Sequence, residues 1–270
     1  MKKQDIIRKK NRTWQFPDFE EDQLQSKAND YCICVFVINE GERILKQLET
    51  MAKYAGGVDI VVADGGSNDG SLERNFLKKQ RVRALLTKKG PGKLSAQMRM
   101  AFAWALNEDY KGIIVVDGNG KDDVSAIPNF IKLLKQGYDH VQGSRFIPGG
   151  NAINTPLSRE LGLHLLHAPL ISLAARKRHT DTTNGFRAYS SQLLRDDDIA
   201  VFRDIFQTYE LHYYLAIESS RRKQYRVIET PVTRSYPKKG KTPTKISPLK
   251  GNAHILGVLF SAVTGKYAKK

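Results

Sequence analysis

The chain has few cysteines, and their placement excludes two classes of protein. Only Cys32 and Cys34 occur among 270 residues. They lie two residues apart on one face of a predicted strand, a spacing too extended for a mutual disulfide, and no second pair of metal ligands accompanies them. We therefore expect core thiols rather than a disulfide scaffold or a zinc site.

Long apolar segments are also lacking. No run approaches the roughly 20 apolar residues of a membrane-spanning helix, and no signal-peptide core follows the basic start. We therefore expect a protein of the reducing cytosol, whose membrane contact, if it has one, is peripheral.

Acidic residues are outnumbered, with 28 Asp and Glu against 44 Lys and Arg, which gives a formal net charge of +16. Such a charge predicts an anionic partner, namely nucleic acid, a membrane surface or phosphorylated substrates. Charge alone does not choose among the three. The length favours one main domain with tails, because 270 residues suffice for one good core.

Strand and helix patterns alternate from Tyr31 onward. This alternation is typical of an α/β fold, with a mostly parallel central sheet, right-handed crossovers and flanking helices. We expect a basic extension at 1–29, a main domain at 30–235, and a mobile basic loop with a C-terminal helix at 236–270. The predicted strands are 31–38, 58–63, 81–86, 112–116, 139–143 and 225–232, and the predicted helices lie near 44–55, 70–79, 93–109, 123–137, 158–176 and 208–222.

The two tails carry apolar residues whose placement the sequence leaves open. The extension contains Trp14, Phe16 and Phe19 among polar and basic residues. The sequence leaves three alternatives open for this extension: it packs on the domain, it contacts a membrane, or it contacts neither. The segment 254–263 is apolar but too short to span a bilayer, so it is predicted to be a docked or an interfacial helix.

Two of the buried strand patterns end on an acid. VDIVVAD ends at Asp64 and continues into Gly-Gly-Ser-Asn-Asp-Gly, and GIIVVD ends at Asp117 and continues into Gly-Asn-Gly-Lys. Ligands of helix-covered parallel sheets collect at the carboxyl ends of strands. Two acidic loops at that edge predict a site for a cation, a nucleotide or both.

Five short segments follow one another in an informative order: VINE at 37–40, DGGSNDG at 64–70, DGN at 117–119, GSRF at 143–146 and TNGFRAY at 183–189. Together they resemble family 2 glycosyltransferases of the Rossmann-like GT-A fold. The chain is most similar to the branch of dolichol-phosphate mannose synthase and the polyprenyl-phosphate glycosyltransferases. The resemblance implies a UDP- or GDP-linked sugar as donor.

The resemblance implies that the early loops hold this donor, with side chains at the strand ends accepting hydrogen bonds from the base and ribose. The alternatives are that Asn39 or Glu40 caps the next helix, and that Ser67 and Asp69 form a turn and cap near residue 71. The Gly-Pro-Gly loop before Lys93 presents backbone N–H groups to phosphate, or is a plain turn. The donor-binding candidates are Asn39, Glu40, Asp64, Ser67, Asp69, Lys93, Asp117, Gly118 and Asn119.

Asp117 matches the first acid of the family's Asp-x-Asp element, and Asn119 stands where the second acid usually stands. Carboxylate oxygens hold a hard cation that bridges the departing diphosphate, so the resemblance implies Mg²⁺ or Mn²⁺ at Asp117 and Asn119. The uncharged amide predicts a reduced metal affinity or partial replacement of the metal by Lys121. Asp122 and Asp123 are expected to cap the following helix.

The acceptor candidates lie in the second half of the chain and are Arg145, Arg187, Arg234 and Lys241. Arg145 follows a strand and can present a bidentate fork to phosphate. The resemblance aligns Arg187 with the arginine that meets a lipid phosphate. Arg234 and Lys241 lie in a predicted loop where the family commonly has Arg-Gly-x-Ser-Lys. This chain departs from that pattern, so its closing lysine is unidentified.

The nucleophile decides which residues catalyse. A polyprenyl phosphate is already an anion, so arginines only need to orient it, whereas a saccharide hydroxyl, as in polysaccharide or capsule synthesis, needs Glu210 as base. The catalytic candidates are therefore Asp117, Arg187 and Glu210, and a single displacement would invert the anomeric carbon.

A hypothesis of another class is a non-catalytic, basic α/β protein that binds nucleic acid. Recognisable nucleic-acid motifs are missing, and acids at two strand ends would repel a phosphate backbone. The predicted partners are therefore a nucleotide-sugar donor, a lipid-phosphate or saccharide acceptor and an anionic membrane surface, without nucleic acid.

Overall fold

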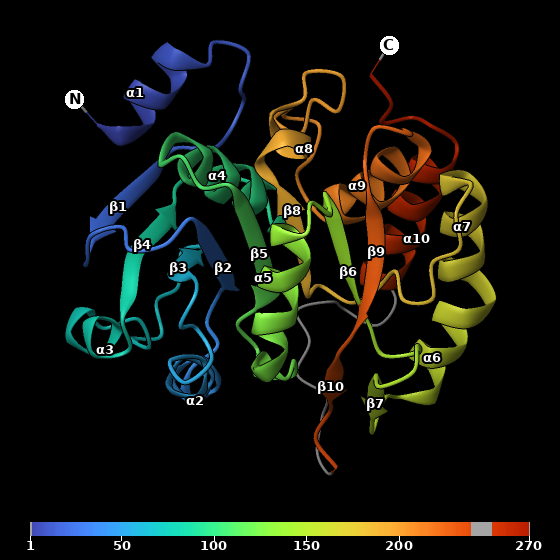
Figure 1. The fold of residues 1–270 in the computed structure, drawn as a ribbon, viewed down its shortest axis with the longest axis horizontal. Coiled ribbons are helices and arrows are strands. Elements are labelled where there is room, and N and C mark those ends of the chain that lie inside the picture. The colour runs from blue at the N-terminus through green and yellow to red at the C-terminus, as the bar shows by residue number, and fades with distance from the viewer. Residues whose placement is uncertain (1, 239–249, 270) are drawn as a thin grey trace.

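The computed structural model describes residues 2–238 and 250–269, which form an α/β fold around one eight-stranded sheet (Figure 1). Its elements in chain order are α1 (Lys3–Lys10), β1 (Phe19–Gln23), β2 (Tyr31–Val37), α2 (Glu42–Met51), β3 (Asp59–Asp64), α3 (Arg74–Lys79), β4 (Val82–Lys88), α4 (Leu94–Asn107), β5 (Gly112–Asp117), the 3-10 turn η1 (Val124–Ala126), α5 (Ile127–Lys135), β6 (His140–Ser144), β7 (Asn151–Ile153), α6 (Leu157–Gly162), the π-helical segment η2 (Leu163–His167), α7 (Ala168–Ala175), β8 (Arg187–Ser190), α8 (Ser191–Arg195), α9 (Glu210–Arg221), β9 (Val227–Pro231), β10 (Thr233–Ser235) and α10 (Lys250–Val263).

The strand order of the large sheet is β1-β4-β3-β2-β5-β8-β6-β9. β4, β3, β2 and β5 are parallel, and β6 and β9 run in the same direction, whereas β1 and β8 are antiparallel to their neighbours. β10 and β7 form a second, parallel pair. The prediction of a mostly parallel sheet is confirmed, and the carboxyl ends of β2, β3 and β5 share one edge.

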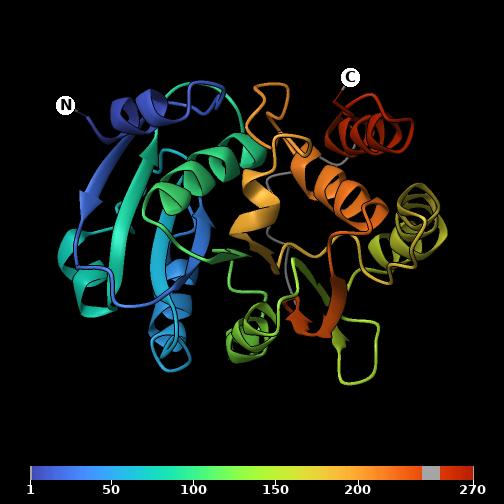
Figure 2. The same cartoon turned by 45° about the horizontal axis from the view of Figure 1, so that its top comes forward.

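Helices cover both faces of the sheet (Figure 2). β2, β3 and β5 are continuous apolar runs because side chains on both of their faces are buried. α4 packs on one face and is buried along 95–106. α2 and α5 pack on the other face through residues such as Ile44, Leu48 and Phe130. Cys32 and Cys34 are free and buried in the core, as predicted.

The N-terminal extension lies on the domain. β1 extends the sheet by pairing with β4, and Trp14 stacks on Phe202 with 4.0 Å between ring centroids. Phe16 and Phe19 are buried in the same hydrophobic cluster as α4. The scattered aromatic residues of a polar leader are therefore the anchors that hold it on the core.

The second half of the chain contains three strands that the sequence did not predict, β7, β8 and β10, and β10 carries Arg234, which was predicted to lie in a loop. β8 enters the sheet where a loop was predicted, between β5 and β6. Of the two alternatives for the C-terminal segment, a docked or an interfacial helix, the structure shows the docked one, because Val258, Leu259 and Ala262 of α10 pack on α7 and α9. Within 2–238 and 250–269, no helix has the length and apolar character needed to cross a membrane.

Candidate active site

The two acids predicted to mark the site lie on the strands that flank β2. In the parallel register Val37 pairs with Asp64, and Phe36 pairs with Asp117. Adjacent strands lie about 4.8 Å apart, so the two acids are about 10 Å apart at one sheet edge. Gln97 of α4 ties the strand ends together, because its Nε2 donates to the carbonyl of Val37 and to that of the residue before Asp64, each at 3.0 Å.

The predicted donor residues fasten the loops after β2 and β3 to each other. Asp64 Oδ1 accepts from Ser67 N at 2.9 Å and from Ser67 Oγ at 2.6 Å. Ser67 Oγ in turn accepts from Asn39 N at 2.9 Å, and Asp69 Oδ2 accepts from Gly41 N at 2.8 Å. Four of the candidates therefore meet in one hydrogen-bonded pair of loops beside the strand ends.

The capping alternative for Asn39 and Glu40 is wrong. The N-cap of α2 is Gly41, and no side chain makes a cap hydrogen bond there. Glu40 pairs instead with Arg43, with 2.8 Å between Oε2 and Nη2. Asp69 forms a turn, because its carboxylate accepts a hydrogen bond from Ser71 N. This turn ends before α3 begins, so Asp69 does not cap that helix.

Lys93 stands exposed at the N-cap of α4, and its backbone N donates to Gln207 O at 2.7 Å. Gly92 before it has φ +93°, and a Cβ there would lie 2.5 Å from Gln207 Oε1, so the position requires glycine. Lys88 at the other end of this loop points inward, where its Nζ donates to Gly90 O at 2.6 Å, and burial lowers its pKa.

The turn after β5 is held by packing against β2 and by hydrogen bonds from α2. A Cβ on Gly118 would lie 2.8 Å from a β2 side chain, so only glycine fits. Gln47 of α2 donates to Asp117 O at 2.9 Å and accepts from Gly120 N at 2.7 Å. The Asp117 side chain remains 28% exposed, and Asn119 Nδ2 donates to its Oδ2 at 3.3 Å.

Arg234 of β10 bridges Asp117 and Asp122. The distances are 3.2 Å from Nη2 to Asp117 Oδ2 and 2.5 Å from Nη1 to Asp122 Oδ2. Burial raises the pKa of Asp122, and although burial alone would lower the pKa of Arg234, the two carboxylates raise it. The prediction that Asp122 caps a helix is wrong, because its side chain is the buried partner of Arg234. Asp123 is the cap and accepts from Ser125 N at 3.0 Å.

The segment before β8 packs its backbone on Asp117. A Cβ on Gly185 would lie only 3.2 Å from Asp117 Oδ1. This close approach accounts for the glycine. It places residues 181–187, which we call the acceptor segment, directly against the predicted metal ligand Asp117.

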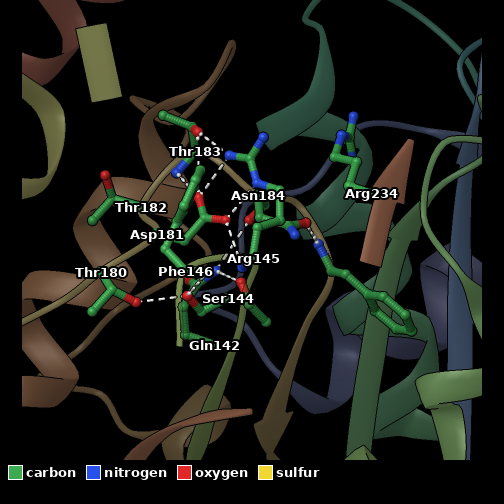
Figure 3. A network of polar contacts seen from close by, with 12 residues as sticks. Gln142, Ser144, Arg145, Phe146, Thr180, Asp181, Thr182, Thr183, Asn184 and Arg234 are labelled. Carbon is green, nitrogen blue, oxygen red and sulfur yellow. Dashed lines mark hydrogen bonds and ion pairs between the residues drawn. The ribbon is translucent and has the colours of Figure 1, made fainter. Parts of the chain in front are cut away.

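Arg145 directs its guanidinium fork at Asp181 (Figure 3). The distances are 2.6 Å from Nε to Oδ2 and 2.9 Å from Nη2 to Oδ1, and Thr183 Oγ1 accepts from Nη2 at 3.0 Å. Although burial alone would lower the pKa of Arg145, Asp181 raises it. Nη1 takes part in none of these bonds and is the group left for an acceptor phosphate, and that role stays a prediction.

Arg187 is buried and donates to three backbone carbonyls. They belong to Asn184 at 2.9 Å, His212 at 2.6 Å and Thr182 at 2.8 Å. The side chain thereby fastens the acceptor segment to α9. These bonds use three of its five N–H groups, so contact with a phosphate would need one of the other two, and that role stays a prediction.

Glu210 begins α9 and is buried. Its Oε2 accepts from Thr208 N and its Oε1 from Thr208 Oγ1, both at 2.6 Å. Action as a base requires this carboxylate to leave Thr208 and also stays a prediction. Lys241 lies outside the described residues.

Asp117 is the residue best suited to hold a divalent cation. The described ranges contain no cluster of three or more His, Cys, Asp or Glu side chains that could bind a metal by itself. Mg²⁺ in phosphate sites, however, needs only one or two carboxylates, because substrate oxygens and water supply the rest. Asp117 also pairs with Arg234, but its carboxylate is partly exposed and lies beside Asn119, so it fits that requirement, whereas the Asp122 side chain is fully buried against Arg234.

A helix-covered parallel sheet with acidic loops at adjoining strand ends is the architecture of an α/β protein that binds nucleotides at its carboxyl edge. The chain belongs to glycosyl transferase family 2, whose model matches residues 32–201. It is therefore a family 2 glycosyltransferase with the GT-A fold.

Two curated relatives are each similar to about two thirds of the chain. The undecaprenyl-phosphate mannosyltransferase of Micrococcus luteus is 28% identical over 185 residues, which cover 65% of this chain and 71% of that protein. The polyprenol monophosphomannose synthase of Mycolicibacterium smegmatis is 26% identical over 181 residues, or 65% of this chain and 66% of that protein.

Solved structures share the fold at low identity. Glucosyl-3-phosphoglycerate synthase of Mycobacterium tuberculosis in complex with UDP has a TM-score of 0.59 and 14% identity, covering 87% of this chain and 80% of that one. The same enzyme with Mn²⁺, UDP and phosphoglyceric acid also has a TM-score of 0.59 at 14% identity, covering 87% and 77%.

Proposed function

We propose that this glycosyltransferase moves a sugar from a UDP- or GDP-linked donor to a polyprenyl or other lipid phosphate, with inversion at the anomeric carbon. The observation that carries the proposal is the partly exposed Asp117 carboxylate at the end of β5, held against the acceptor segment at Gly185. The names of the two curated relatives, both of which contain a polyprenol or its phosphate, support the acceptor class.

The donor lies along the paired loops after β2 and β3. Their mutual hydrogen bonds hold the oxygen-bearing side chains in place before the donor arrives, which reduces the entropy lost on binding. Base and ribose contact Asn39, Glu40, Asp64, Ser67 and Asp69, and the diphosphate lies near Lys93, Asp117, Gly118 and Asn119.

Mg²⁺ or Mn²⁺, held by Asp117 and Asn119, would neutralise charge on the departing diphosphate. The complex of glucosyl-3-phosphoglycerate synthase with Mn²⁺ and UDP, a protein of similar fold, supports this assignment. The chain's own residues keep the turn rigid: Gln47 fixes the backbone on both sides of Asn119, and Arg234 orients the Asp117 carboxylate from behind.

The acceptor phosphate is an anion and needs orientation rather than deprotonation. We assign that task to Arg145, Arg187, Arg234 and Lys241, as contacts or as residues that position the acceptor segment. The site supports a saccharide hydroxyl as acceptor less well. Such a hydroxyl would need Glu210 as its general base, and that carboxylate already accepts two hydrogen bonds from Thr208. A lipid acceptor also implies peripheral contact with a membrane, and we propose its cytoplasmic face.

Nucleotide release from a panel of UDP- and GDP-sugars with Mn²⁺ tests this proposal, with and without a short-chain polyprenyl phosphate. One donor should be consumed only when the lipid phosphate is present. Asp117→Asn should reduce release by about 100-fold or more, on the scale of one lost electrostatic contact in a transition state. The control Asp197→Asn removes an exposed carboxylate and should leave turnover unchanged. Unaltered turnover in Asp117→Asn would remove that residue from the mechanism.

A further inference from the structure

An exposed leucine face runs along the helix formed by α6, η2 and α7. Leu157, Leu161, Leu165 and Leu173 are spaced in multiples of four residues and are 70%, 48%, 75% and 76% exposed. Pro169 fills the remaining position of the series and is also exposed. Both ribbon views place this helix at the outer margin of the molecule (Figures 1 and 2).

The π-helical segment reduces the angle over which these leucines spread around the helix. In an ideal α-helix of 3.6 residues per turn, a spacing of four drifts by about 40° at each step. A π-turn contains more residues than an α-turn, so η2 at Leu163–His167 counters this drift in the middle of the series. The opposite side, with Leu163, Ile171 and Ala174, is buried, and Ile171 and Ala174 pack on α9 and α10.

The charges around this leucine face are one-sided. From 157 to 178 the chain carries Arg159, Arg176, Lys177 and Arg178 against the single acid Glu160. All four residues are exposed, although Lys177 Nζ donates to Val227 O and Arg159 lies over the ring of Tyr236, which leaves Arg176 and Arg178 as the basic groups best placed to meet lipid. Apolar side chains flanked by Lys and Arg are the composition of helices that lie in the interface of an anionic membrane. Two copies of the chain meeting through this face would instead bring basic groups against basic groups.

The leucine face also adjoins the acceptor elements. The ring of His164 contacts that of Phe146, the residue after Arg145, with 4.5 Å between centroids. An open pocket of about 330 Å³ lies beside this ring pair and is lined by Phe146, His164, Pro169 and Arg178 among others. A lipid bilayer touching the leucine face is therefore next to the segment assigned to the acceptor phosphate.

We propose that the leucine face of α6, η2 and α7 is a docking surface for an anionic phospholipid bilayer. It inserts its leucines among the acyl chains while the flanking basic residues meet lipid phosphates. The inference rests on the proposed function for its biological purpose, but vesicle binding measures it without donor, acceptor or turnover.

Co-sedimentation with phosphatidylcholine vesicles, with and without phosphatidylglycerol, is the test. The wild-type chain should bind the vesicles that contain phosphatidylglycerol. Leu165→Asp/Leu173→Asp should lower its partition coefficient by about tenfold or more, because charges replace two exposed leucines that would insert among the acyl chains. Ile205→Asp, at an exposed isoleucine elsewhere, should bind as the wild type does. Equal binding by the double variant and the wild type would overturn the proposal.

Two further measurements separate the alternatives. Sedimentation velocity without vesicles detects self-association, and a wild-type dimer that the double variant abolishes, combined with no vesicle binding, would make this face a contact between copies.

In Leu165→Trp, emission should shift to shorter wavelength on adding anionic vesicles, which reports insertion without a disruptive charge. An unshifted spectrum alongside vesicle binding would place the membrane contact elsewhere and overturn the proposal. Loss of donor turnover with vesicle binding intact would affect only the proposed function.

Discussion

Replacing Arg234 by methionine should cost a large share of the folding free energy. The guanidinium is 9% exposed and pairs with Asp122, which is fully buried, and with Asp117. Removing one partner of a buried pair leaves an uncompensated charge, which costs about 3–5 kcal/mol. Domains of this kind have about 5–15 kcal/mol in total, so Arg234→Met should be close to the limit of stability.

A double-mutant cycle makes this prediction specific. Arg234→Met/Asp122→Asn removes both charges, so its loss should be smaller than the sum of the two single losses, by about 0.5–3 kcal/mol. Urea unfolding can be followed by tryptophan fluorescence, because Trp14 and Trp104 are both buried. Additive losses, or a loss below about 1 kcal/mol in Arg234→Met, would refute the reasoning, since neither is compatible with a stranded buried charge.

The same cycle has a pH signature. Burial raises the pKa of Asp122 above its ordinary value, so the folded state holds that proton more tightly than the unfolded state does. In Arg234→Met, protonation of the Asp122 carboxylate removes its unpaired buried charge. The loss in Arg234→Met should therefore grow as the pH rises and shrink as it falls, and a loss independent of pH would contradict this account.

Two other predictions concern packing and protonation. Gly118→Ala should destabilise by about 1–3 kcal/mol because its Cβ meets a β2 side chain at 2.8 Å, whereas Gly257→Ala, a helical position with open space around it, should be neutral or stabilising; equal effects in thermal unfolding would contradict the geometry. Burial, with Arg187 and Lys177 adding to it, lowers the pKa of His179 to about 4, so the folded state resists protonation. The part of the stability that depends on His179 should be complete above about pH 6.5 and fall by about 3 kcal/mol as the pH drops to about 4, and His179→Gln should remove that part in urea titrations at several pH values.

The central strands could be predicted from sequence because their apolar character comes from burial on both faces. β8 could not, since Arg187–Ser190 is four residues long and begins with a buried arginine whose partners are backbone carbonyls. β1 could not either, because FEEDQ is mostly acidic and is a strand only through its pairing with β4. Short polar strands are specified by tertiary pairing, which leaves little periodicity in the sequence.

The sequence predicted which loops form the site, but not which side chains pair with one another within it. The strand-end rule placed Asp64 and Asp117 at one edge, and the register confirms that both strands flank β2. Arg234 reaches Asp117 across 117 positions of sequence, a proximity that no local pattern encodes. Gln47 and Gln97 carried one local signal, an amide on the buried side of a helix, which requires hydrogen-bonding partners in the core.

The acidic first strand has a consequence for solubility. β1 is the outermost strand on its side of the sheet and carries Glu20, Glu21 and Asp22 in a row. An open strand border is a template for pairing with another molecule, and like charges along it repel such a pairing. Deleting the first 29 residues would bare β4, whose VRALLTK lacks acids, so the truncated enzyme should aggregate through strand addition while the intact one stays dispersed.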